Sequence, residues 1–170
     1  MTKDKAEKVL AILNLKHDTN QISMIRTANH FGIKKVFIIG DELRHKEGSC
    51  KSCHRHMSIR SFEEWQFFSS IAAKRYKLVL IEKTENSVPI EDFTFPERCV
   101  IMTGHESNGF SKDFIDAADY IVHIPTLGDQ VPCLNTGVAC GIGLYEATKR
   151  DALHESKDDN NVSDEVKDGK

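Results

Sequence analysis

The chain has 170 residues, which suits one domain with a substantial core, and its 39% hydrophobic and 29% charged residues are typical of an ordinary soluble protein. No apolar run reaches the length of a membrane span and the start at Met1–Lys8 is charged rather than signal-like, so we expect a cytoplasmic protein without a membrane partner. Five cysteines, an odd number, argue against a secreted disulfide framework, and the net charge of −3 neither supports nor excludes a nucleic-acid partner.

Short apolar runs rich in β-branched residues alternate along the chain with stretches of helical character. Asn20 can cap a helix that Gly32 ends in the left-handed conformation, and Ser61 precedes a helical repeat over Phe62–Tyr76. Strands that alternate with helices indicate an α/β fold with a mainly parallel sheet and helices on both faces. The predicted strands are Val9–Leu15, Val36–Gly40, Leu78–Ile81, Val100–Thr103 and Tyr120–Ile124, and the two later helices are Lys112–Ala118 and Thr136–Lys149.

Residues 1–150 are predicted to form the domain and residues 151–170 an acidic tail. The tail holds seven of the 26 acidic and three of the 23 basic residues, so 1–150 carries 19 acidic and 20 basic residues. We expect the tail to be solvated and disordered from about Lys157 onward. Within the domain, the stretch Asp41–Ser58 is rich in charge, Ser, Cys and His, and is predicted to be a long functional loop.

The first cluster of residues that could carry out chemistry is the predicted helix at Asn20–Gly32. Arg26 lies on a helical wheel away from the apolar side formed by Met24, Ala28 and Phe31. Its guanidinium can therefore face outward at the carboxyl edge of the sheet, where open α/β sheets bind ligands. An arginine there can hold a phosphate or stabilise a developing alkoxide, and a plain surface arginine is an equally open alternative.

The second cluster, Thr103–Phe110, follows a strand directly. Gly104 and Gly109 flank Glu106, so the backbone can approach a ligand closely while the carboxylate points into the same space. The cluster lacks the Gly-Lys-Ser/Thr ending of a phosphate loop and the spacing of a dinucleotide fingerprint. A plain connection from strand to helix remains the alternative.

The third cluster joins Ile124–Gly128 to a helix that begins behind Asn135. That helix carries three glycines, and a glycine inside a helix costs roughly 1 kcal/mol relative to alanine. We therefore expect close approach of another backbone, from a partner subunit or a tightly threaded loop; a merely weak helix is the alternative. The glycines are Gly137, Gly141 and Gly143.

Together and in this order, the three clusters resemble the SpoU (TrmH-like) family of SPOUT RNA 2′-O-ribose methyltransferases. The resemblance spans about residues 8–148. Each motif is weak singly, but the ordered set at this spacing is specific. The matching residues are Asn20, Arg26, Ala28, Phe31 and Gly32, then Gly104, Glu106 and Gly109, and then Ile124, Pro125, Gly128, Leu134, Asn135, Ala139, Tyr145 and Glu146.

The resemblance implies a SPOUT domain whose C-terminal segment forms a deep trefoil knot, a rare exception to the rule against knots. It also implies a homodimer in which the last helices of two subunits pack together, and transfer of a methyl group from S-adenosyl-L-methionine to a ribose 2′-hydroxyl of tRNA or rRNA. Arg26 is the implied activating or phosphate-binding group, with Asn20, Glu106 and Asn135 positioning it and the substrate. The implied cofactor-binding residues are Glu82, Thr103, Gly104, Ile124, Gly128, Cys133 and Leu134.

Two residues depart from the family pattern. Ile22 stands where the family has glycine, and Cys133 stands where it has serine. A thiol is a weaker hydrogen-bond donor than a hydroxyl. These departures leave open a relative that binds RNA or cofactor without turnover. An unrelated nucleotide-binding α/β domain is a further alternative, against which the missing glycine-rich phosphate fingerprint argues.

A possible metal site lies in the long loop. Cys50 and Cys53, with His45, His54 and His56 nearby, have the spacing of a zinc half-site. A second Cys-x-x-Cys pair is missing, so no metal is predicted, and the alternative is a loop whose His and Arg residues suit RNA phosphates. The sequence names neither the RNA nor the modified nucleotide.

Overall fold

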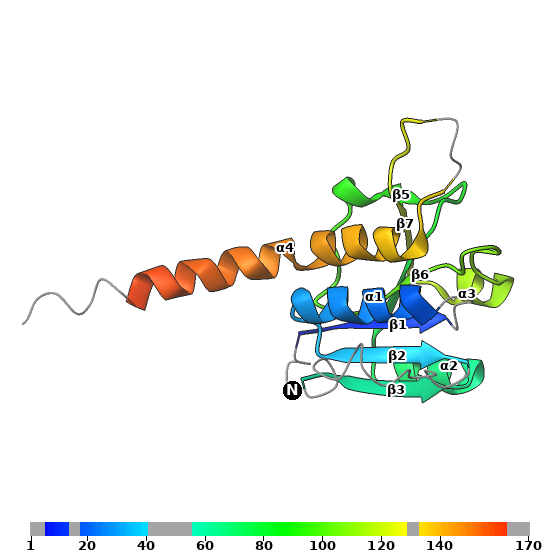
Figure 1. Cartoon of the computed structure of the whole chain (residues 1–170), viewed down its shortest axis with the longest axis horizontal. Coiled ribbons are helices and arrows are strands. Elements are labelled where there is room, and N and C mark those ends of the chain that lie inside the picture. The colour runs from blue at the N-terminus through cyan, green and yellow to red at the C-terminus, as the bar shows by residue number, and fades with distance from the viewer. Residues whose placement is uncertain (1–5, 14–17, 41–55, 129–132, 163–170) are drawn as a thin grey trace, which may run out of the picture.

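The computed structural model describes residues 6–13, 18–40, 56–128 and 133–162, the last stretch with side chains up to residue 149. Within these residues the chain forms one seven-stranded sheet with the order β3-β2-β1-β6-β4-β7-β5, and every pair of neighbouring strands is parallel (Figure 1). The predicted α/β class with a parallel sheet is therefore confirmed. The strands are β1 (Glu7–Leu13), β2 (Lys35–Ile39), β3 (Ser58–Phe62), β4 (Lys77–Ile81), β5 (Val88–Pro89), β6 (Arg98–Thr103) and β7 (Tyr120–His123).

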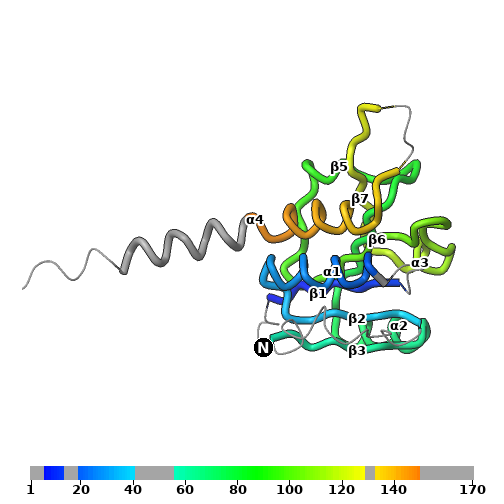
Figure 2. Tube along the Cα trace, viewed as in Figure 1, coloured from blue at the N-terminus to red at the C-terminus, as the bar shows by residue number. Residues whose placement is uncertain are grey.

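Helices cover both faces of the sheet. On one face, α1 (Asp18–His30) lies beside α4 (Thr136–Val162), and on the other lie α2 (Glu64–Ala73) and α3 (Lys112–Ala117) (Figures 1 and 2). A short 3₁₀ helix, η2 (Ile90–Asp92), follows β5. None of the described helices combines the length and apolar character of a membrane span.

Two hydrophobic cores, one on each face of the sheet, follow from the alternation of side chains along the strands. Successive side chains of β1 point to opposite faces, so Leu10 packs in the core under α1 and α4, whereas Val9 packs in the core under α2 and α3. Because both faces are covered, the central strands are nearly continuous apolar runs, which is why the sequence reveals them. Phe67 of α2 and Phe114 of α3 fill the second core with their rings tilted at a centroid distance of 6.1 Å.

The stretch before α2 differs from the prediction. Residues 58–62 form strand β3 at the sheet edge, paired with β2, rather than the end of a loop and the start of a helix. Phe62 is held in the strand by an edge-on contact with Phe37, with ring centroids 5.0 Å apart. The helix begins only at Glu64, where the Glu63 backbone N–H donates to Gln66 Oε1 at 3.1 Å. β5 and η2 were not predicted at all.

The ends of the other helices show one confirmed and two corrected predictions. Gly32 ends α1 with a positive φ of 74°, and the following N–H of Ile33 donates to the Ala28 carbonyl at 2.9 Å, as expected for a glycine-ended helix. Asn20 is not the cap, because α1 begins at Asp18 and Asn20 lies in its first turn. Helix α4 passes the predicted end at Lys149 and continues to Val162, while the acidic tail as a separate unit stays a prediction.

One glycine of α4 has a packing reason within the chain. A Cβ at Gly143 would collide with the Ile81 side chain of β4, and a Cβ at Gly141 would lie 3.8 Å from Thr27 of α1. Of these two positions, close approach within the chain is therefore seen at Gly143 alone, where it is made by a side chain of the sheet, and approach by a partner subunit or a threaded loop stays a prediction. The trefoil knot depends on the path between Ile124 and Thr136, and it stays a prediction because 129–132 lie outside the described residues.

A charged cluster stabilises the amino ends of the strands. Lys35 Nζ lies 2.6 Å from Glu7 Oε1, the Tyr76 hydroxyl donates to the same carboxylate, and Arg98 lies 4.2 Å above the Tyr76 ring. Burial would raise the pKa of Glu7, but hydrogen bonds from Lys35 and Tyr76 outweigh it and hold that pKa below its ordinary value of 4.5. Burial and the bond to Glu7 raise the pKa of Tyr76 to about 12.

We predict that Glu7→Gln lowers the free energy of unfolding at pH 7 by on the order of 1 kcal/mol, since it removes a charge-assisted cluster. A lowered carboxyl pKa stabilises the fold at pH values above the ordinary pKa of the carboxyl. This contribution disappears as the pH falls through the lowered pKa of the folded state. Urea unfolding at pH 7 and at pH 3 measures both effects. A stability difference as large at pH 3 as at pH 7 would contradict this assignment.

Candidate functional site

A pocket opens at the carboxyl ends of β4, β6 and β7. It is a cavity of about 230 Å³, at the edge of the sheet where ligands of open α/β folds bind. Of the predicted cofactor-binding residues Gly128 alone is not part of its lining. The other six line it: Glu82, Thr103, Gly104, Ile124, Cys133 and Leu134.

The loop after β6 doubles back on itself to form one wall. His105 and Gly109 exchange backbone hydrogen bonds of 2.9 and 3.0 Å. A Cβ at Gly104 would lie 2.9 Å from the Gly109 Cα and 2.8 Å from Glu82 Oε2, so only glycine fits there. The two glycines thus allow the backbone to approach the Glu82 carboxylate and the loop itself, while close approach to a ligand stays a prediction.

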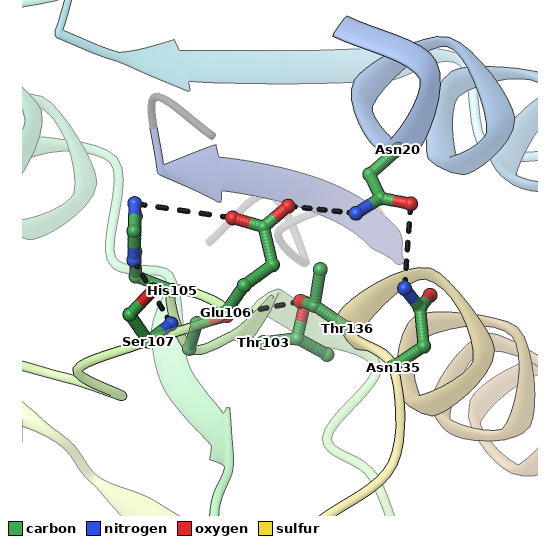
Figure 3. A network of polar contacts seen from close by, with 8 residues as sticks. Asn20, Thr103, His105, Glu106, Ser107, Asn135 and Thr136 are labelled. Carbon is green, nitrogen blue, oxygen red and sulfur yellow. Dashed lines mark hydrogen bonds and ion pairs between the residues drawn. The ribbon is translucent and has the colours of Figure 1, made fainter. Parts of the chain in front are cut away.

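A chain of hydrogen bonds runs from the start of α4 to Glu106 (Figure 3). Asn135 Oδ1 accepts the backbone N–H groups of Gly137 and Val138 at 2.9 and 3.3 Å, so its amide nitrogen faces the other way. That nitrogen donates to Asn20 Oδ1 at 3.4 Å, and Asn20 Nδ2 donates to Glu106 Oε1 at 2.7 Å. We call Asn135, Asn20 and Glu106 the amide relay.

Every hydrogen bond of the amide relay is donated in the same direction, from the start of α4 toward Glu106. The N–H groups at the start of a helix carry partial positive charge, and through their bonds to Asn135 the two amides are polarised toward the Glu106 carboxylate. Glu106 is thus built in as an acceptor, and it lines the pocket. The structure therefore brings together three of the four predicted catalytic residues, although they lie on α1, on the loop after β6 and before α4.

Two residues that sequence reasoning missed complete this wall. The Ser107 backbone N–H donates to His105 Nδ1 at 3.2 Å, so the ring proton lies on Nε2, which is 3.9 Å from Glu106 Oε2. The buried Thr136 hydroxyl donates to the Gly104 carbonyl at 2.9 Å and lies 2.9 Å from Thr103 Oγ1. No sequence signal distinguishes either residue, because Thr136 acts through contacts with a distant part of the chain and the His105 ring is placed by the fold of its own loop.

Arg26, the fourth predicted catalytic residue, takes no part in the hydrogen bonds of the amide relay and is not in the lining of the pocket. It is exposed on the outer side of α1, whereas Met24 and Ala28 are fully buried, as the helical wheel predicted. Within the described part of the chain Arg26 has no hydrogen-bond or ion-pair partner.

The two departures from the family pattern lie in different places. Ile22 is half-buried on α1 and is not part of the pocket lining, whereas Cys133 is exposed and lines the pocket. The candidate metal ligands at 45–54 lie outside the described residues. Among the residues that are described, no group of three metal-ligating side chains exists.

The family model described as "SpoU rRNA Methylase family" matches residues 7–145. The chain belongs to this family. It is 25% identical over 153 residues to the tRNA (guanosine(18)-2'-O)-methyltransferase of Aquifex aeolicus, a match that covers 86% of this chain and 72% of that protein. It is 34% identical over 96 residues to the tRNA (cytidine(34)-2'-O)-methyltransferase of Ancylobacter novellus, which covers 56% of each chain.

Solved structures of SpoU proteins share the fold. The SpoU methyltransferase AviRb from Streptomyces viridochromogenes, solved in complex with the cofactor AdoMet, superposes with a TM-score of 0.78. The two chains are 22% identical, and the match covers 89% of this chain and 63% of AviRb. The SpoU chain described here thus spans between about half and three quarters of these three relatives.

Proposed function

We propose that this SpoU protein transfers a methyl group from S-adenosyl-L-methionine to a ribose 2′-hydroxyl of tRNA or rRNA. The observation that carries the proposal is the amide relay, which ends on Glu106 in the wall of a pocket at the ligand-binding edge of a SpoU fold. Two relatives that are named as tRNA 2′-O-methyltransferases support the reaction and the class of substrate.

The pocket fits S-adenosyl-L-methionine in its chemistry. Ile81, Ile124 and Leu134 give apolar surface for a purine, and Glu82 and Glu106 give negative charge for a cofactor that carries a positive sulfonium and an ammonium group. When bound, the cofactor supplies a methyl group that is already activated for transfer. The protein then has to orient the ribose hydroxyl and accommodate the loss of its proton.

The residues of the chain divide this work. The ribose oxygen bonds to the methyl carbon while the bond between that carbon and sulfur breaks, which leaves S-adenosylhomocysteine, and the hydroxyl proton passes to solvent. Where the proton leaves ahead of methyl transfer, negative charge develops on the oxygen. Arg26 would stabilise that charge or hold the adjacent phosphate, which its exposed guanidinium is free to do. Glu106, held by Asn20, would accept a hydrogen bond from the substrate and fix its position.

The functional unit in this proposal is a homodimer. Leu134, just before α4, and Val138 and Tyr145 on α4 form an apolar stripe, with exposed fractions of 49, 51 and 54%. The spacing of Val138 and Tyr145 puts these two on one side of α4, a pattern that suits a partner helix. Arg26 lies outside the pocket of its own chain, so a second copy that packs on α1 and α4 would bring one subunit's Arg26 near the other's pocket.

We predict that Val138→Asp converts the dimer to a monomer and abolishes transfer, since it places a charge in an apolar contact while the position stays exposed in the monomer. Trp65→Asp is the matched control, because Trp65 is a large exposed side chain on α2, at the opposite face of the sheet. Sedimentation velocity measures the oligomeric state of the parent and of both variants. A parent chain that sediments as a 19.2 kDa monomer contradicts the dimer.

The experiment that tests the function is incubation of the protein with methyl-labelled S-adenosyl-L-methionine and fractionated total RNA, followed by mapping of the labelled ribose. We expect label in a tRNA or rRNA fraction at one 2′-oxygen. Calorimetric binding of the cofactor together with no label in any RNA would instead identify a relative that has lost turnover.

A further inference from the structure

A second histidine, outside the amide relay, lines the pocket. His123 is the last residue of β7 and lines the pocket, and its ring Nδ1 lies 3.0 Å from the Ser87 hydroxyl oxygen. Ser87 closes a turn that leads from β4 to β5. Among the described residues, His123 is the hydrogen-bond partner that the Ser87 side chain has outside that turn, and the proposed reaction does not use it.

A count of protons fixes the state of this ring. The Ser87 hydroxyl donates its single proton to the Thr84 carbonyl at 2.7 Å, because a carbonyl oxygen can only accept. The same hydroxyl oxygen accepts the Thr84 backbone N–H at 3.0 Å. Only an acceptor lone pair of Ser87 remains for His123, so His123 Nδ1 must carry a proton and donate it.

The other ring nitrogen is therefore an acceptor whenever the ring is neutral. A neutral imidazole with its proton on Nδ1 has a lone pair on Nε2, and this is the polar group that His123 can offer to the pocket. His105, in the same pocket, has the opposite arrangement, with its proton on Nε2. The two histidines thus offer one acceptor and one donor from different parts of the pocket wall.

We propose that His123 is a cofactor-recognition residue whose Nε2 accepts a hydrogen bond from a donor in the adenosine half of the cofactor, with Ser87 as its positioning residue. This inference rests on the proposed cofactor. The neutral donors of S-adenosyl-L-methionine are the exocyclic amine and the two ribose hydroxyls, all in the adenosine half. Its ammonium group is positive and finds the carboxylates Glu82 and Glu106 in the same pocket.

Titration calorimetry with S-adenosylhomocysteine tests the assignment. His123→Asn keeps an amide that can donate to Ser87 but removes the acceptor at Nε2, and we expect its Kd to rise about tenfold, the usual effect of one lost hydrogen bond. Ser87→Ala frees the ring to change tautomer, and a rise of about threefold is expected from the lost orientation. His30→Asn, at an exposed position of α1, is the control that should bind like the parent.

Three analogues of S-adenosylhomocysteine separate recognition from a structural role: the 2′-deoxy, the 3′-deoxy and the N6,N6-dimethyl compounds. The affinity ratio of parent to His123→Asn should stay near tenfold for the two that keep the recognised donor, and fall to about one for the analogue that lacks it. An equal ratio for all three, or unchanged binding of S-adenosylhomocysteine by His123→Asn, overturns the inference. A parent that binds no S-adenosylhomocysteine overturns the proposed cofactor as well, whereas cofactor binding without RNA labelling affects the proposed reaction alone.

Discussion

Asn20→Asp is expected to lower kcat/KM for methyl transfer by about 100-fold, which corresponds to about 2.7 kcal/mol of transition-state stabilisation. The substitution replaces the donor 2.7 Å from Glu106 Oε1 by a second carboxylate oxygen. Two carboxylates at that distance cannot both stay ionised and correctly placed. We expect the stability of α1 to be unchanged, because an acidic side chain in the first turn of a helix is favourable.

The pH dependence of this variant separates the explanation from a general loss of structure. The introduced carboxylate and Glu106 would share a proton as the pH falls, and the shared proton restores a donor to Glu106. We therefore expect the ratio of variant to parent activity to rise toward acidic pH. A ratio that is constant with pH, in a variant with the parent's melting temperature, would contradict the role of the amide relay.

Asn135→Asp is the matched control. Its carboxylate can still accept the N–H groups of Gly137 and Val138, so the start of α4 stays capped, but it cannot donate to Asn20. The lost bond is long, at 3.4 Å, and we expect a smaller decrease of about tenfold with no loss of stability. The order of the two effects, large for Asn20 and moderate for Asn135, follows from the distances along the relay.

The sequence predicts the fold wherever one physical signal dominates. The central strands are buried on both faces, so their apolar runs are long enough to recognise without coordinates. The signal fails at the edges of the sheet: β3 carries exposed polar residues such as Ser58 and Arg60, and β5 has two residues. Such strands exist because a neighbouring strand offers free hydrogen-bonding groups, and a local pattern does not contain that information.

In the candidate site, too, the sequence predicts some features and the coordinates are needed for others. Asn20, Glu106 and Asn135 were predicted as separate members of three motifs, and the structure joins them across 86 and 115 positions of the sequence. The direction of the amide relay needs coordinates, because it depends on which atom of each amide faces α4. His123 carries no motif at all, and its role emerges only from the protons of Ser87.

Arg26→Ala is expected to lower kcat/KM for methyl transfer by at least about 100-fold, similar to the loss of a donor that stabilises an oxyanion. The melting temperature and the Kd for S-adenosylhomocysteine should be unchanged. Arg26 is exposed, has no partner among the described residues and does not line the pocket, and alanine is a strong helix former. A large kinetic effect without a structural one would mean that Arg26 acts on the RNA.

Arg26→Lys then distinguishes the two possible tasks of the guanidinium. Lysine keeps a point charge that can hold a phosphate, so a phosphate-binding role predicts a raised KM, largely restored kcat and strong dependence on salt. A role at the developing alkoxide needs the fixed fork of donors, and predicts that Lys is nearly as poor as Ala in kcat. Arg60→Ala, at an exposed arginine of β3, is the control, and parent rates for Arg26→Ala would remove Arg26 from the reaction.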